Sequence, residues 1–108
     1  MATLRATQFF IGIVTGPGPT TLYTVPSGKR IVVHGLSVYN EEGSTQATTV
    51  YVAGTQTLWA GVLAAAGSPG SLAVTLMYEV FNAGQSILIV NGSGKKVTVN
   101  MSGTLLFV

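Results

Sequence analysis

Short stretches of alternating apolar and polar residues follow one another along the chain, and they predict β-strands. The longest, residues 29–40, is apolar on both faces, which is typical of a sandwich strand whose outer side is covered. It follows Pro26-Ser27-Gly28, where a fixed φ precedes a residue free to take a positive φ, so we expect strand, tight turn, strand. A strand of this length is usually central. We therefore expect its partners to come from both sides of it in the sequence.

The same pattern, bounded by Gly, Pro, Asn and Ser, predicts eight or nine short strands in all. They are residues 8–14, 20–25, 29–40, 47–52, 57–63, 72–78, 86–90, 96–101 and 104–108. Residues 91–95 predict a hairpin loop, with 96–101 as its return strand. Residues 54–70 also carry apolar residues at helical spacing. Because Gly61 interrupts them and no capping residue is well placed, we favour a strand over 57–63 and a loop over 64–70.

Many short strands with little helix predict an all-β fold, an antiparallel β-sandwich that is jelly-roll-like. With 108 residues the chain is expected to hold a single domain, residues 8–108. Residues 1–7 are polar and small, and we expect them to form a flexible N-terminal arm.

Charged residues are scarce. They make up 7% of the chain, against about a quarter in a typical soluble domain. Such a deficit suggests that other protein covers much of the surface, in an oligomer or a lattice. A neutral surface of Thr, Ser, Asn and Gly is the alternative, and it stays open. The net charge of +2 comes from too few cations for nucleic-acid binding.

The sequence also excludes several classes of site and location. It contains no Cys, so it can form neither disulfides nor thiolate metal sites, which fits assembly in a reducing cytoplasm. No secretion signal is evident, and no run of about 18 apolar residues could cross a membrane as a helix. His34 is the only His and there is no Asp, so a Ser-His-Asp triad cannot form. We expect no enzyme activity, no metal and no cofactor.

The aromatic residues allow two interpretations. Trp59 and the four tyrosines could line a sugar-binding face, or they could be core and subunit-interface residues, where aromatics are also enriched. We favour the second. The contact segments that we predict are residues 1–8 and residues 54–70 around Trp59. The candidate interface residues are Thr3, Leu4, Arg5, Gln8, Tyr39, Tyr51, Leu58 and Trp59.

Two runs of the sequence form motifs: Leu22-Tyr23-Thr24-Val25-Pro26-Ser27-Gly28-Lys29-Arg30, and later Phe81-Asn82-Ala83-Gly84-Gln85-Ser86-Ile87. In these runs the chain resembles small β-sandwich structural proteins of tailed bacteriophages, in which such a strand-turn-strand and such a later turn recur. The similarity spans most of the chain from about Thr20 onward. It rests on turns of the fold, so it carries over no site residues.

The resemblance implies a virion protein, present on the head as a decoration protein or at the tail as an accessory or adsorption protein, usually as a trimer or larger ring. We expect a head decoration protein that binds and stabilises the capsid surface as a homo-oligomer, with a trimer as the expected number. Its partners would be the major capsid protein or tail proteins, without nucleic acid or membrane. It would be assembled in the host cytoplasm. The alternative is a glycan- or receptor-binding module of a tail or spike.

Overall fold

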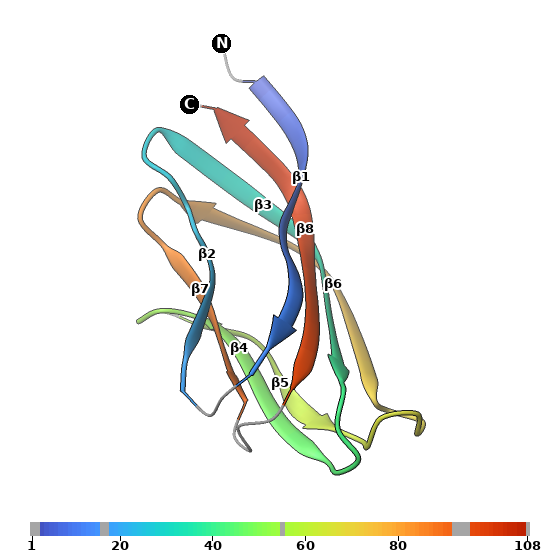
Figure 1. The fold of residues 1–108 in the computed structure, drawn as a ribbon. Coiled ribbons are helices and arrows are strands. Elements are labelled where there is room, and N and C mark those ends of the chain that lie inside the picture. Colours follow the sequence, from blue (N-terminus) through green and yellow to red (C-terminus); the bar gives the residue numbers. More distant parts are fainter. Residues whose placement is uncertain (1–2, 16–17, 55, 92–95, 108) are drawn as a thin grey trace.

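The computed structural model describes residues 3–15, 18–54, 56–91 and 96–107. For residues 3–5 it describes the backbone alone. Eight strands make up the fold (Figure 1). They are β1 (Thr3–Val14), β2 (Thr20–Thr24), β3 (Lys29–Asn40), β4 (Gln46–Val52), β5 (Gln56–Leu63), β6 (Leu72–Asn82), β7 (Ser86–Asn91) and β8 (Val97–Phe107). Among the described residues no helix is long and apolar enough to cross a membrane.

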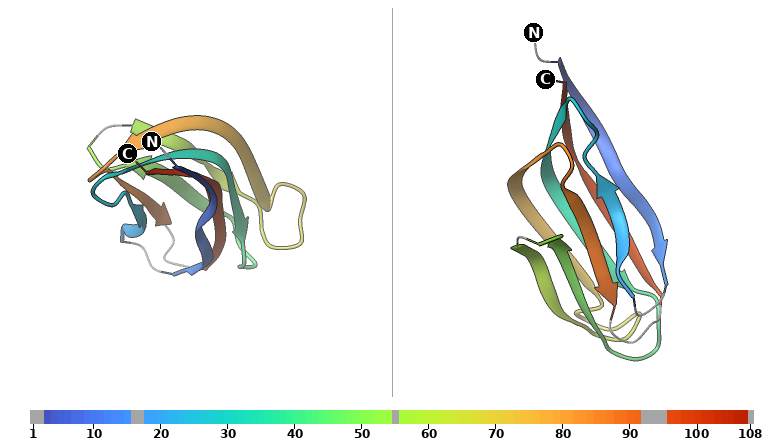
Figure 2. Two further views of the ribbon diagram at one scale, coloured as in Figure 1. Left: turned by 90° about the horizontal axis from the view of Figure 1, so that it is seen from above. Right: turned by 90° about the vertical axis from the view of Figure 1, so that its left-hand side faces the viewer.

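The strands form two four-stranded antiparallel sheets that pack as a sandwich (Figures 1 and 2). Sheet A has the order β1-β8-β3-β6, and sheet B has the order β2-β7-β4-β5. The first strand pairs with the last, β2 with β7, β3 with β6 and β4 with β5, which is the pairing of one long hairpin rolled up into two sheets. The contacts of β3 with β8 and of β4 with β7 close the roll. This is a jelly roll, and the predicted fold class is confirmed.

The two motif runs meet at one end of the sandwich, because each contains a connection that crosses from one sheet to the other. In the β2–β3 turn the Lys29 N–H donates to the Pro26 carbonyl, and Gly28 takes a φ of 74°. The β6–β7 turn is built in the same way, with Gly84 at a φ of 88°. Val25 joins the turns: its N–H donates to the Gln85 carbonyl and its carbonyl accepts from the Gly84 N–H.

At the other end of the sandwich the buried side chain of Asn40 joins the connecting loops. Its amide donates to the carbonyls of Ser44, at 2.7 Å, and Ala64, at 2.9 Å. Its side-chain oxygen accepts from the Glu42 N–H and from the buried Gln46 amide. A buried amide is stable only when its polar atoms are paired, and here the pairing fixes the loops after β3 and β5.

The core lies between the sheets and consists mainly of Val, Ile and Leu from alternate strand positions. The molecule is elongated, with extents of 49, 24 and 20 Å, and the first residues of β1 lie beside the last of β8 (Figure 2). Thr3 pairs with Phe107 there.

Sheet A is kinked along one line that runs across all four strands. Gln8, Ser102, Gly35 and Leu76 are cross-strand neighbours, and the register shifts beside them in β1, β3 and β6. β-Bulges of this kind bend and twist a sheet locally. Beside this line β8 lies very close to β3, because a Cβ atom on Gly103 would lie 1.9 Å from the Val32 carbonyl oxygen.

Several predicted boundaries were wrong. β1 begins at Thr3 rather than at residue 8, so residues 3–7 of the expected arm are paired with β8, and residues 1–2 lie outside the described part. The predicted break in the last strands, between 101 and 104, does not occur, since β8 runs without interruption through Gly103. β6 continues to Asn82, four residues further than predicted.

Two expected pairings were also wrong. The strands around residues 91–95 do not form a hairpin, because β7 belongs to sheet B and β8 to sheet A; residues 92–95 themselves lie outside the described part. β3 is central, as predicted, but both of its partners, β6 and β8, follow it in the sequence. In both cases a local pattern defined the strand but not the sheet that it joins.

Candidate assembly surface

The outer face of β6 is apolar along most of its length. Six alternate residues of this strand point away from the sandwich; the last of them is Asn82, and the other five are apolar: Leu72, Val74, Leu76, Tyr78 and Val80. We call them the β6 strip. Leu76 and Tyr78 are 84% and 83% exposed, and the other three are more than half exposed.

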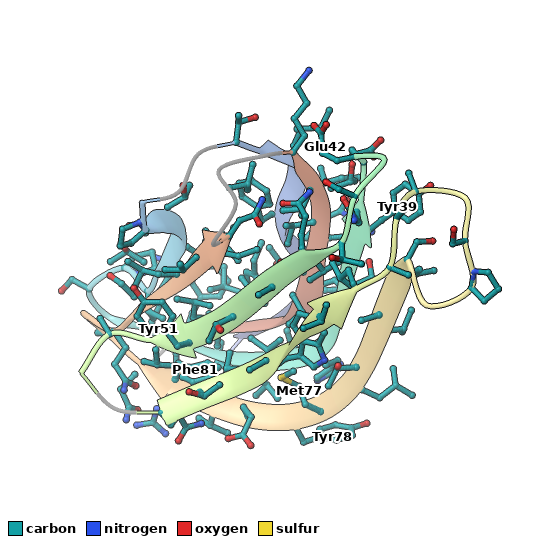
Figure 3. All side chains as sticks on the ribbon, turned by 90° about the horizontal axis from the view of Figure 1, so that it is seen from below. Tyr39, Glu42, Tyr51, Met77, Tyr78 and Phe81 are labelled. Atoms are coloured by element: carbon teal, nitrogen blue, oxygen red, sulfur yellow. The ribbon has the colours of Figure 1, made fainter. Side chains whose placement is uncertain are left out.

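The inner face of β6 is the less apolar of the two. It carries Ala73, Thr75, Met77 and Glu79, and only Phe81, 3% exposed, is fully buried in the core. Figure 3 shows Tyr78 outside the strand and Met77 and Phe81 inside it. The polarity of the strand is thus the reverse of that expected at a solvated sheet surface. An apolar row this continuous is a candidate interaction surface.

Neighbouring residues of β3 extend this surface. On the outer face Val32 is paired with Val80, and Tyr39 with Leu72. The His34 ring lies 4.9 Å from the Tyr78 ring, tilted by 45°. None of these side chains carries a fixed charge; the charged neighbour on this face is Arg30, which is paired with Asn82 at the end of β6.

A second, smaller apolar patch lies at the opposite edge of sheet A. Ile11 and Ile13 of β1 point outward and are 66% and 60% exposed. We call this pair the β1 patch. Between the patch and the β6 strip the outer face carries Thr98, Asn100, Ser37 and Tyr39. Further along the same strands lies a shallow depression lined by Ala6, Thr7, Gln8, His34, Ser102 and Gly103. In this polar band the Gln8 amide donates to the Asn100 side chain at 2.7 Å.

The predicted interface residues do not form one surface. Gln8 and Tyr39 lie on the outer face of sheet A, beside the surface just described. Leu58 and Trp59 of β5 pack against the core, and the Trp59 ring lies over Gly61. Tyr51 lies on sheet B. Of Thr3, Leu4 and Arg5 the backbone alone is described, and it pairs with the end of β8.

The aromatic residues do not make a common platform. The ring centroids of Tyr23 and Phe9 lie 4.9 Å apart, and Tyr23 packs against the core. Burial raises the pKa of the Tyr23 phenol. The Tyr39 hydroxyl accepts a hydrogen bond from the Gly67 N–H at 3.2 Å. Figure 3 shows Tyr39, Tyr51 and Tyr78 on separate parts of the molecule. This arrangement does not provide the sugar-binding face considered from the sequence.

In the part of the chain that the structure describes, no three His, Cys, Asp or Glu side chains gather as metal ligands would. Sequence reasoning missed the β6 strip. The signal was present in the alternation of residues 72–78, but alternation identifies two faces without telling which one is inside.

Comparisons with known proteins identify the fold. No model of a protein family matches the chain, and no curated protein sequence matches it. Among solved structures it is similar to a subunit of the disulfide-linked pili that form Bacillus endospore appendages, with a TM-score of 0.59 and 13% identity over 100% of this chain and 90% of that one. It is also similar to the virus-like particle protein of the extra small virus of the giant freshwater prawn Macrobrachium rosenbergii, with a TM-score of 0.56 and 12% identity. That match covers 97% of this chain and 79% of the other.

A third similar structure is the particle of infectious bursal disease virus, with a TM-score of 0.50 and 12% identity. The match covers 98% of this chain but 31% of that one. At these identities the similarity establishes a jelly-roll fold of the kind found in viral and pilus structural proteins.

Proposed function

We propose that this protein is a structural subunit of a bacteriophage virion, without enzyme activity, and more finely a head decoration protein. It assembles with copies of itself and binds the capsid surface, which it reinforces. The observation that carries the proposal is the β6 strip, five outward apolar side chains on an edge strand. The similarity to subunits of a pilus and of viral particles supports it.

The strip is proposed to pack against a second copy of the chain. The largest exposed apolar patch on a typical monomer covers about 300–600 Å² and often marks an interaction site. A stable interface takes about 800 Å² from each partner, so the strip would form the apolar centre of one side, with neighbouring residues of β3 at its rim. A chain with 7% charged residues offers a neutral surface to its own copies, because little like-charge repulsion has to be overcome.

Capsid contact is assigned to the end of the molecule where β1 begins, with Thr3, Leu4 and Arg5 as the contact residues. An oligomer would present this end several times. Weak contacts made simultaneously would then give firm attachment through avidity.

Light scattering on the purified protein over a range of concentrations tests self-assembly. The wild type should form a stable oligomer, with three copies as the proposed number, and a Leu76→Ser/Tyr78→Ser variant should be a folded monomer. Val62→Ser is the matched control, because Val62 is 70% exposed on the other sheet, outside the strip. A monomeric wild type, or an oligomer that the double substitution leaves intact, would contradict the proposal.

The position on the virion is a separate test. Virions of a phage that encodes this chain would be separated into heads and tails, and each fraction probed with an antibody against the protein. We expect the head fraction to carry it, in a ratio fixed to the major capsid protein. Detection in the tail fraction alone would favour the accessory role at the tail.

A further inference from the structure

We infer that the β6 strip of one copy packs against the β1 patch of the next, so that the oligomer is a closed head-to-tail ring. This inference rests on the proposed function, since it names the surface of the second copy that the strip meets. Three observations carry it: the two patches lie on opposite edges of one sheet, one end of the strip lies at the same height along the strands as the β1 patch, and polar residues separate the two.

The equal height follows from the register of sheet A. Ile13 is paired with Thr98, Thr98 with Tyr39, and Tyr39 with Leu72. The neighbouring row on the same face runs in the same way, from Ile11 through Asn100 and Ser37 to Val74. The β1 patch and one end of the β6 strip are therefore the two ends of the same cross-strand rows.

A rotation about an axis parallel to the strands would bring the strip of one copy to the patch of the next without any shift along the axis. A contact between two different patches that involves rotation without translation closes into a ring when the rotation angle is a whole fraction of a full turn, whereas a shift along the axis would give an open helix. The outer faces of sheet A would then be directed toward the axis, with the apolar edges meeting between neighbouring copies.

The polar band favours this arrangement over a two-fold face-to-face dimer. Full overlap of two outer faces would bury Gln8, Asn100 and the depression beside His34 on both copies. Burying polar groups without new partners is unfavourable. In the ring only the edges are covered, with Leu76 level with Gln8 of the next copy, and Thr98, Asn100 and Ser37 stay open to water around the axis.

Cysteine cross-linking tests the contact directly, because the chain has no Cys of its own. An Ile13→Cys/Leu72→Cys variant should oxidise to covalent oligomers up to the closed ring on a non-reducing gel, since a disulfide requires Cα atoms within about 7 Å. Leu72→Cys alone and Ile13→Cys/Val62→Cys should stay uncross-linked. Ile13→Thr should lower the oligomer fraction as the strip variant does.

Two results would overturn the inference while leaving self-assembly intact. A covalent dimer from Leu76→Cys alone would show that two strips meet across a two-fold axis. An oligomer by light scattering that neither cross-links in the Ile13→Cys/Leu72→Cys variant nor weakens in Ile13→Thr would show that the strip meets another surface. A wild type that is monomeric throughout would instead contradict the proposed function.

Discussion

Gly103 is the residue on which the shape of sheet A depends most directly. The nearest atoms to an added Cβ are all backbone: the Val32 oxygen at 1.9 Å, the Val32 carbonyl carbon at 2.9 Å and the Val33 Cα at 3.0 Å. Backbone atoms in paired strands cannot move aside as the end of a flexible side chain can. Any other residue at this position must separate β8 from β3 at the centre of the sheet.

We therefore expect Gly103→Ala to lower the free energy of unfolding by about 3 kcal/mol, at the upper end of the range for overpacked sites. Gly43→Ala is the control, because nothing lies within 4 Å of an added Cβ there, and it should change stability by less than about 0.5 kcal/mol. Urea denaturation of the three proteins, followed by tryptophan fluorescence, measures both effects. Equal stability of the two variants would refute the role given to Gly103.

For single residues, the sequence predicts roles that depend on neighbouring residues in the chain and misses roles that depend on contacts with distant strands. The role of Gly28 was predicted correctly because the turn is made by residues 26–29 themselves, with one hydrogen bond across four residues. The requirement for Gly103 depends on Val32, which is distant in sequence, and the residue was placed in a gap between two strands. The same limit applies to Trp59, whose packing over Gly61 and against the core follows from how β5 joins sheet B.

Among the elements, β6 shows best how a pattern can identify a strand without orienting it. Both sets of alternate residues contain apolar side chains, so residues 72–78 predict a strand whichever face is buried. Its pairing with β3 turns Phe81 toward the core and leaves Leu76 outside. The exposed apolar face of β6 could therefore not be located from the sequence, whose predicted contact segments are the N-terminal residues and the region around Trp59.

The two faces of β6 should differ in what they stabilise. Phe81→Ala should destabilise the monomer by about 3 kcal/mol, as a truncated core aromatic does. Leu76→Ala should change monomer stability by less than about 0.5 kcal/mol and should reduce oligomer formation. The measurement is denaturant unfolding at concentrations where the protein is monomeric, or in a Tyr78→Ser background. A larger loss from Leu76→Ala than from Phe81→Ala would mean that the strand is turned the other way.

For the whole molecule, composition and strand spacing were sufficient to predict an all-β jelly-roll-like sandwich, because short alternating strands separated by turns have few other ways to bury their apolar faces. The pairing order was not predictable, since it joins β1 to β8 across the full length of the chain. The two motif runs of the phage resemblance have a structural explanation in this order. They contain the two sheet-crossing turns that Val25 joins by hydrogen bonds.

The topology also predicts how the molecule folds and assembles. Because the first strand must find the last, the chain has to close long loops before its main contacts form, and domains of this kind fold in milliseconds to seconds. Stopped-flow refolding should show one phase in that range whose rate is independent of protein concentration. A slower phase whose rate rises with concentration should follow, as folded subunits associate through the β6 strip. The Leu76→Ser/Tyr78→Ser variant should retain the first phase and lose the second. If the variant kept both phases, the concentration-dependent step would have to come from another part of the surface.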